Sequence, residues 1–165
     1  MIARTSNFIH PTAIIYPNVD IGEGNWIGPY CIIGAAAESR ANWGAQGKVI
    51  IGNNNRFTGL VTIDAGMDGV TRIGDNTFWM KGAHAGHDVE VGDWVTVSCG
   101  AKIGGHCHIG DKVNIGLNAV IHQRVIVPDG CMIGASAFVG KKSVLKPYYK
   151  YAGVPVKELG PNIKP

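Results

Sequence analysis

Five of the six histidines stand between residues 84 and 122. Four of them, His84, His87, His106 and His122, are the candidates for chemistry, and Asp88 directly follows one of these. An imidazole titrates near neutral pH, which suits it to take a proton from a hydroxyl or an amine. Acyl transfer needs such a base together with an N–H donor for the oxyanion that forms at the carbonyl. These residues point to that chemistry only if the fold brings them together.

A period of six residues runs along most of the chain. An aliphatic or aromatic residue recurs almost without exception at the first position of each hexad, through residues 9–33, 51–63 and 73–139. Glycine often follows it at the second position, and the fifth is mostly small, as at Ala101 and Cys107. This period fits neither a helix nor a simple strand alternation. It predicts a coil of short strands that turns a corner every six residues.

The expected fold is all-β, a parallel β-helix in which coils of 18 residues stack through parallel strand pairing. Residues 1–165 are expected to form this single domain, with glycine at the second position serving tight corners and close backbone approach. Interruptions at about 35–48 and 66–72 break the repeat, the first as a projecting loop or a degenerate coil, and such insertions often bind ligands. Residues 145–165 are expected to leave the coil as a capping tail. An antiparallel barrel with Ile–Gly hairpins is the alternative that this spacing disfavours.

Stacked coils place residues that are 18 apart above one another. One column contains His87, Gly105, Gln123 and Lys141, and the adjacent column contains Asp88, His106, Arg124 and Lys142. We expect His87 to act as the base and the Gly105 N–H, one coil above, to bind the oxyanion. Asp88 is expected to orient a ring, although adjacent residues on a strand usually point apart. Because these residues gather on one corner, a site is favoured over unrelated exposed side chains.

Lys141, Lys142 and Arg124 form a basic strip on the same corner. Such a strip suits the phosphates of coenzyme A or the phosphopantetheine of an acyl carrier protein. A solvated edge with no ligand is the alternative interpretation.

Composition and charge exclude several other classes. The net charge of +3 is too weak and too scattered for a nucleic-acid partner, although it is compatible with a phosphate-bearing ligand. No stretch of about 18 apolar residues indicates a membrane span, and the N-terminus lacks the apolar core of a secretion signal. Cys31, Cys107 and Cys131 occupy the small inward position, and no Cys-x-x-Cys spacing occurs. A cytoplasmic location is therefore expected.

Three segments resemble one known family. Gly82-Ala83-His84-Ala85-Gly86-His87-Asp88 resembles the His-x-x-His-Asp segment of the UDP-N-acetylglucosamine O-acyltransferases of lipid A synthesis. Gly104-Gly105-His106 resembles their Ala-Gly-His segment, and Ala119-Val120-Ile121-His122-Gln123 their Ala-Val-His-Gln segment. The resemblance covers most of residues 9–140 and implies a left-handed β-helix.

The resemblance also implies roles. His87 falls on the catalytic base and Gly105 on the oxyanion contact, while His84, His106, His122 and Gln123 fall in the segments that help hold the nucleotide sugar and the acyl donor. No bound cofactor or metal is implied, because the donor, an acyl-CoA or an acyl carrier protein, is itself a substrate. Proteins of this superfamily are generally homotrimers with the site between neighbouring prisms, which outward apolar residues such as Trp79, Met80 and Trp94 would suit.

The chain also departs from that family. We expect it to lack the additional coils and the C-terminal helical domain. The family's Asp-x-Lys pair aligns with Ser39 and Ala41, so that Glu38 and Arg40, one residue earlier, are the candidates to replace it in binding the sugar. Whether oxygen or nitrogen is acylated stays open, as does the length of the acyl chain. Residues 151–157 resemble the closing Ala-Gly-x-Pro-Ala-Lys of acetyltransferases that use acetyl-CoA, or form only a capping turn.

Two other functions are weighed against acyl transfer. A metalloenzyme similar to the γ-class carbonic anhydrases would hold zinc or iron on three histidines, but no two histidines are 18 or 36 residues apart. No histidine pair is therefore expected to stack within one chain. A catalytically silent scaffold is the third hypothesis, against which the histidine cluster argues.

Overall fold

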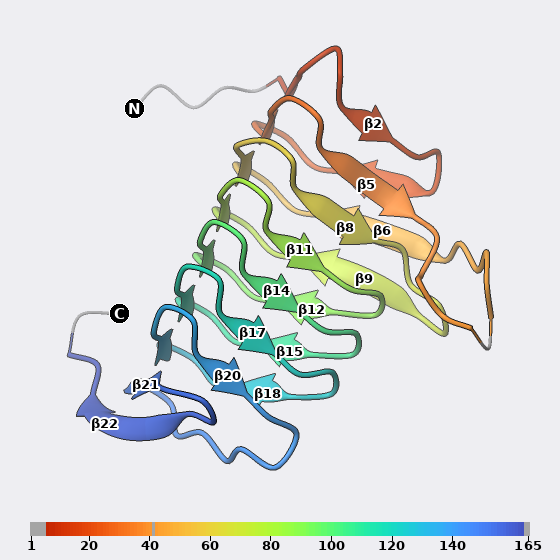
Figure 1. The fold of residues 1–165 in the computed structure, drawn as a ribbon. Coiled ribbons are helices and arrows are strands. Elements are labelled where there is room, and N and C mark those ends of the chain that lie inside the picture. The colour runs from red at the N-terminus through yellow and green to blue at the C-terminus, as the bar shows by residue number, and fades with distance from the viewer. Residues whose placement is uncertain (1–5, 41, 164–165) are drawn as a thin grey trace.

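The computed structural model describes residues 6–40 and 42–163, and within them the chain forms 22 strands and no helix. The strands wind into stacked triangular coils, a left-handed parallel β-helix that runs from β1 and β2 at one end to β21 and β22 at the other (Figure 1). The expected fold class is confirmed. None of the described segments is a helix that could span a membrane.

The strands form three sheets, one on each side of the prism. The first sheet contains β1 (Phe8–Ile9), β4 (Trp26–Ile27), β7 (Arg56–Phe57), β10 (Phe78–Trp79), β13 (Thr96–Val97), β16 (Asn114–Ile115), β19 (Met132–Ile133), β21 (Tyr149–Ala152) and β22 (Lys157–Pro161). The second sheet contains β2 (Ile14–Ile15), β5 (Ile32–Ala35), β8 (Thr62–Asp64), β11 (His84–Ala85), β14 (Lys102–Ile103), β17 (Val120–Ile121) and β20 (Phe138–Val139). The third sheet contains β3 (Val19–Ile21), β6 (Lys48–Ile51), β9 (Val70–Ile73), β12 (Glu90–Val91), β15 (His108–Ile109) and β18 (Ile126–Val127).

The register of these sheets confirms the sequence arithmetic. From β10 onward, neighbouring strands pair residues that are 18 apart, as Trp79 with Val97 and Ala85 with Ile103 do. Nearer the N-terminus the offset is 30 between Ile27 and Phe57 and 22 between Phe57 and Trp79. The columns predicted from residue 87 onward therefore follow the 18-residue spacing, whereas strands that pair across the first or the second insertion are offset by 30 or 22 residues.

The first and fifth hexad positions fill the interior of the prism, as expected. Phe57 and Trp79 are fully buried and stack with ring centroids 5.9 Å apart. The Trp79 indole N–H donates to the buried Thr77 hydroxyl at 2.9 Å. Trp79 was expected to face outward as well, and that expectation is wrong. Of the proposed outward residues, Trp94 is exposed and Met80 is half-buried.

The corners of the coils differ in part from expectation. Glycine at the second position serves close approach, since a Cβ on Gly104 would lie 2.6 Å from the Gln123 backbone nitrogen in the next coil. The left-handed backbone that turns the corner falls instead on the fourth position. It includes non-glycine residues such as Asp88, with φ of 55°, and His106, with φ of 56°.

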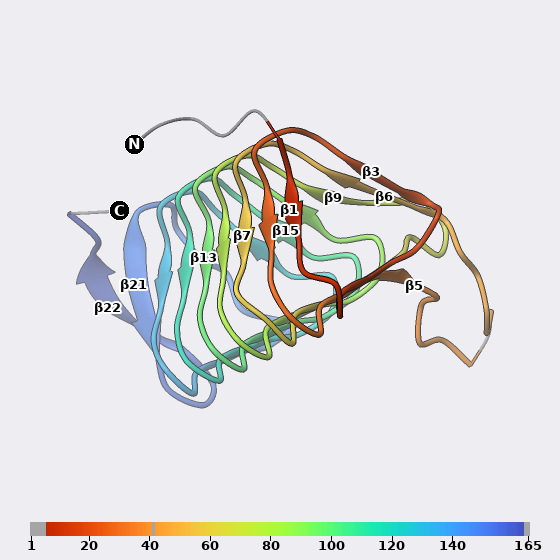
Figure 2. The same cartoon turned by 90° about the horizontal axis from the view of Figure 1, so that it is seen from above.

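Both interruptions are insertions into otherwise regular coils. The first is the segment between β5 and β6, which projects from one edge of the prism (Figures 1 and 2), so it is a loop and not a degenerate coil. The second is shorter than expected, because β9 already begins at Val70. The two insertions touch where the Gly47 N–H donates to the Gly66 carbonyl at 2.8 Å.

The C-terminal segment stays in the coil longer than expected. β21 pairs in parallel with β19, and Tyr151 is buried above Ile133, so residues 149–152 extend the first sheet. Only β22, which pairs antiparallel with β21, leaves the coil direction and caps this end. Part of the segment 145–165 therefore forms a further coil. Its apolar residues, such as Tyr151 and Leu145, still pack against the core of the prism.

Candidate active site

His87 and Asp88 form a directly bonded pair. The His87 Nδ1 and the Asp88 Oδ2 lie 2.8 Å apart, and both side chains are largely buried. The expectation that adjacent residues point apart is wrong here because Asp88 has the left-handed backbone of the corner, which interrupts the extended alternation of a strand. With Nδ1–H donated to the carboxylate, the Nε2 of His87 is left as the basic atom.

The second insertion holds this carboxylate in place. Asp88 Oδ2 accepts the Met67 N–H at 2.9 Å, and Oδ1 accepts the Gly69 N–H at 2.7 Å. The Asp88 N–H donates to the Thr71 hydroxyl at 2.9 Å. Burial by itself raises the pKa of Asp88, but the bonds from His87 and from the backbone of residues 67–69 lower it overall. Asp88 therefore stays ionised and orients His87.

Gly105 packs against the His87 ring. A Cβ at position 105 would lie 2.8 Å from His87 Nε2 and 2.9 Å from Cε1, so only glycine leaves this ring where it is. No acceptor among the described residues takes the Gly105 N–H. At another corner of the prism, the N–H groups at the third hexad position do have acceptors. The Asp75 N–H donates to Asp93 Oδ1 at 2.7 Å, and the Asp93 N–H donates to Asp111 Oδ1 at 2.8 Å. The free amide beside a basic Nε2 is the arrangement that an oxyanion contact requires.

His106 completes the cluster from the next coil. Its ring meets the His87 ring edge to face with centroids 4.9 Å apart, so the two histidines meet between adjacent columns, as their clustering on one corner predicts, and do not stack. The adjacent columns meet because both corners turn at the fourth position and the His106 N–H donates to the His87 carbonyl. The buried His106 Nε2 lacks a hydrogen-bond partner in the described part of the chain and lies 3.9 Å from Asp88 Oδ2.

His87, Asp88 and His106 also form a possible metal-binding group, with ligand atoms within 4.8 Å of one another. The Asp88 oxygens, however, already accept N–H donors from His87 and from residues 67–69. A metal on Asp88 would have to displace some of these bonds. The chemistry of the donor set therefore fits an oriented base better than a metal centre.

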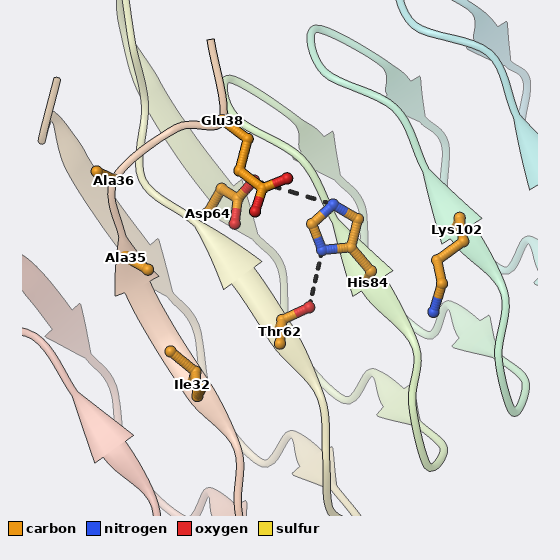
Figure 3. A pocket seen from close by; sticks show the side chains of 8 residues that line it. All are labelled: Ile32, Ala35, Ala36, Glu38, Thr62, Asp64, His84 and Lys102. Atoms are coloured by element: carbon orange, nitrogen blue, oxygen red, sulfur yellow. Dashed lines mark hydrogen bonds and ion pairs between the residues drawn. The ribbon is translucent and has the colours of Figure 1, made fainter. Parts of the chain in front are cut away.

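A pocket of about 420 Å³ adjoins this cluster on the second sheet. Glu38, Thr62, Asp64, His84 and Lys102 line it, together with three smaller apolar residues (Figure 3). His84 Nδ1 lies 2.8 Å from the Thr62 hydroxyl, and its Nε2 lies 3.9 Å from Asp64 Oδ2. Burial, and then the nearby Lys102, lower the pKa of His84, which favours its neutral form.

Asp64 is the residue that the sequence analysis missed. It is only 8 % exposed, and burial followed by the Glu38 carboxylate raises its pKa to about 6. The sequence does contain a signal, because Asp64 is the one carboxylate at the second hexad position, where glycine is most common. That position is displaced from the 18-residue columns by the second insertion, which hid its neighbours.

The remaining predicted residues lie around this core. His122 is half-buried beside Phe138 with ring centroids 6.3 Å apart, and its Nδ1 lies 3.0 Å from the Gln123 carbonyl oxygen. Five further residues are exposed and do not line the pocket, namely Gln123, Arg124, Lys141, Lys142 and Arg40. Ala41, to which the family's Asp-x-Lys pair extends, lies outside the described residues.

Known proteins share the repeat of this chain. The family of bacterial transferase hexapeptide repeats (six repeats) matches residues 71–105. The acyl-[acyl-carrier-protein]–UDP-N-acetylglucosamine O-acyltransferase of Rickettsia canadensis is 33 % identical over a stretch that covers 48 % of this chain and 45 % of that protein. The chain thus spans less than half the length of this curated relative.

Solved structures extend the similarity to nearly the whole chain. The UDP-N-acetylglucosamine O-acyltransferase of Moraxella catarrhalis matches with a TM-score of 0.79 at 29 % identity, covering 94 % of this chain and 75 % of that one. The Bacteroides fragilis UDP-N-acetylglucosamine acyltransferase matches with a TM-score of 0.81 at 30 % identity, covering 96 % and 62 %. The chain is therefore a left-handed β-helix of the hexapeptide-repeat type that resembles the UDP-N-acetylglucosamine O-acyltransferases.

Proposed function

We propose that this chain is an acyltransferase that moves an acyl group from a pantetheine thioester to a hydroxyl or an amine of a nucleotide-linked sugar. The observation that carries the proposal is the His87–Asp88 pair beside the unpaired Gly105 N–H. The named activity of the similar proteins supports the same reaction class.

The reaction follows from this geometry. His87 Nε2 takes the proton of the acceptor as its oxygen or nitrogen attacks the thioester carbonyl, and Asp88 stabilises the imidazolium that forms. The Gly105 N–H donates to the oxyanion of the tetrahedral intermediate. The intermediate then expels the thiolate, which takes the proton from His87. The thioester C–S bond breaks as the new ester or amide bond forms, the proton ends on the thiol, and His87 returns to its neutral state.

The other predicted residues would bind the two substrates. His84, Glu38, His106 and His122 lie on the acceptor side, together with Gln123 and Arg40. The exposed basic residues Arg124, Lys141 and Lys142 suit the phosphates of coenzyme A or the phosphopantetheine of an acyl carrier protein. Coenzyme A and carrier protein are the two donors that an assay must compare.

A homotrimer with the site between neighbouring prisms belongs to this proposal. Two exposed apolar residues, Val120 in β17 and Ile126 in β18, flank the corner that carries His122. Apolar side chains exposed beside a site are typical of a surface that a partner covers. Sedimentation at several protein concentrations would test the trimer, and a monomer at all of them would contradict it.

The central experiment measures thiol release from acetyl-CoA and from an acyl carrier protein thioester against UDP- and dTDP-linked sugars. Replacing His87 by alanine should lower kcat by about 10²-fold or more, as loss of a general base does. His108→Ala is the matched control, because His108 is an exposed histidine on the third sheet paired with Glu90. Equal rates for the wild-type and His87→Ala proteins would refute the assignment of the base.

A further inference from the structure

The pocket beside the catalytic corner contains a buried carboxylate that the reaction above does not use. Asp64, at the end of β8, is 8 % exposed and lines this pocket. No donor among the described residues lies within hydrogen-bond distance of its carboxylate, and the closest ring nitrogen of His84 is 3.9 Å away. The Asp64 carboxylate therefore faces the pocket as an acceptor that is free to bind a ligand.

The partner that Asp64 lacks must be a donor, because an ionised carboxylate only accepts hydrogen bonds. A second carboxylate, Glu38 from the projecting loop, approaches the same space, as Figure 3 shows. The two negative charges act on each other, since Glu38 raises the pKa of Asp64. A neutral ligand would leave this repulsion in place, whereas a cation would remove it.

The basic groups of the pocket do not neutralise the two carboxylates. His84 donates to or accepts from the Thr62 hydroxyl, and its burial favours the neutral ring. The Lys102 ammonium donates to the Gly82 carbonyl and lies on the far side of His84 from the carboxylates in Figure 3. The pocket therefore carries net negative charge and has a free acceptor aimed into it.

Building on the proposed acyl transfer, we propose that this pocket binds a protonated amine of the acceptor, and that the acceptor is an amino sugar that is acylated on nitrogen. An ammonium group supplies three N–H donors and one positive charge, which matches the unpartnered Asp64 and the nearby Glu38. A hydroxyl supplies one donor and no charge. The charge of the pocket thus selects nitrogen over oxygen.

The proton balance of the reaction agrees with this choice. A bound ammonium must lose one proton before its lone pair can attack and a second proton as the amide forms, whereas a hydroxyl loses one. Asp64, whose pKa of about 6 makes it a better proton acceptor than an ordinary carboxylate, can take the first. His87 takes the second from the tetrahedral intermediate and passes it to the departing thiolate. The products are an amide, a free thiol and one proton on Asp64.

The test compares pairs of UDP- and dTDP-linked sugars that differ only by a hydroxyl or an amine at one ring carbon. The wild-type protein should prefer one amine acceptor over its hydroxyl partner by about 10²-fold in kcat/KM, as expected when a charged hydrogen bond is gained. Asp64→Asn, which is nearly isosteric, and Glu38→Gln should each lower kcat/KM for the amine by about 10-fold or more. For the matching hydroxyl acceptor each substitution should lower kcat/KM less than for the amine, so that the amine-to-hydroxyl ratio falls.

Glu90→Gln is the control, since it removes an exposed carboxylate from the third sheet. A preference for hydroxyl acceptors would overturn this inference and leave the proposed acyl transfer intact. Calorimetric titration with the same sugars measures binding without acyl transfer, and so tests the ammonium site separately from the proposed reaction. If no sugar is acylated but the amine sugar binds more tightly and loses this advantage in Asp64→Asn, the ammonium site stands, whereas the proposed reaction and the acylation on nitrogen both fall. Equal binding of both sugars refutes the inference.

Discussion

Gly105→Ala tests the geometry of the catalytic corner most directly. The backbone at position 105 is not left-handed, so alanine adds no conformational strain and the change acts through its Cβ alone. That Cβ would lie 2.8 Å from His87 Nε2, whereas nonbonded heavy atoms settle at about 3.5–4.0 Å. The His87 ring must therefore move by about 1 Å.

The expected loss follows from this displacement. A misplacement of about 1 Å can cost 10²-fold in rate, or about 2.7 kcal/mol of transition-state stabilisation. The Gly105 N–H itself remains, so we expect kcat to fall by about 10²-fold and not to the level of complete inactivation. The melting temperature should change little because the group that must move is one side chain at a corner and not a residue of the hydrophobic core.

The assay is thiol release at saturating acceptor, with circular dichroism to follow unfolding. Gly134→Ala is the control, because its Cβ would meet the Ala152 Cβ at 3.0 Å, a comparable crowding far from His87. A Gly105→Ala protein with normal kcat would show that the His87 ring is not the group that acts. Equal losses in both variants would show that crowding of any coil lowers the rate.

Four further predictions concern charge, the orientation of His87, metal and core. Asp64→Asn should raise the melting temperature at pH 7.5 by a few degrees. The pKa of Asp64 is raised to about 6 in the folded protein, against an ordinary value of 3.8. The wild-type protein therefore loses folding free energy as the pH rises from about 4 through 6, and the asparagine variant does not. The full shift is worth about 3 kcal/mol, which water in the open pocket reduces to about 1–2 kcal/mol, and no gain should remain at pH 4. Asp88→Asn should lower kcat by about 10²-fold to 10⁴-fold with KM nearly unchanged, since His87 loses its orienting acceptor. Treatment of the wild-type protein with a chelator should leave kcat intact. A loss of activity that zinc restores would favour the metalloenzyme instead. Trp79→Ala should lower the free energy of unfolding by about 3–5 kcal/mol in urea titrations, and a loss below about 1 kcal/mol would contradict its burial against Phe57.

Much of the site could be predicted because the hexad period is itself a geometric rule. It placed Gly105 above His87 and His106 above Asp88. In the structure Gly105 packs against the His87 ring, and His106 Nε2 lies 3.9 Å from Asp88 Oδ2. The assignment failed where local backbone geometry overrides the strand pattern. Asp88 reaches His87 because a left-handed residue turns the corner, which no alternation of inward and outward residues reveals.

The pocket could not be predicted for a different reason. Asp64, Glu38 and His84 come from three separate stretches that the two insertions displace from the 18-residue spacing. Their meeting depends on the path of the projecting loop, which carries no periodic pattern. The sequence contains the unusual carboxylate at a glycine position but nothing that says what faces it.

The amino-acid sequence by itself therefore determined the coil, its core and the column that contains His87, because a strict period of six admits few ways to bury its apolar residues. Tertiary structure alone decided that the second insertion holds Asp88 with its backbone N–H groups and that Glu38, Asp64 and His84 meet in one pocket. The reason is physical: a repeat specifies which residues stack, whereas hydrogen bonds and charges at its interruptions depend on where the intervening chain runs.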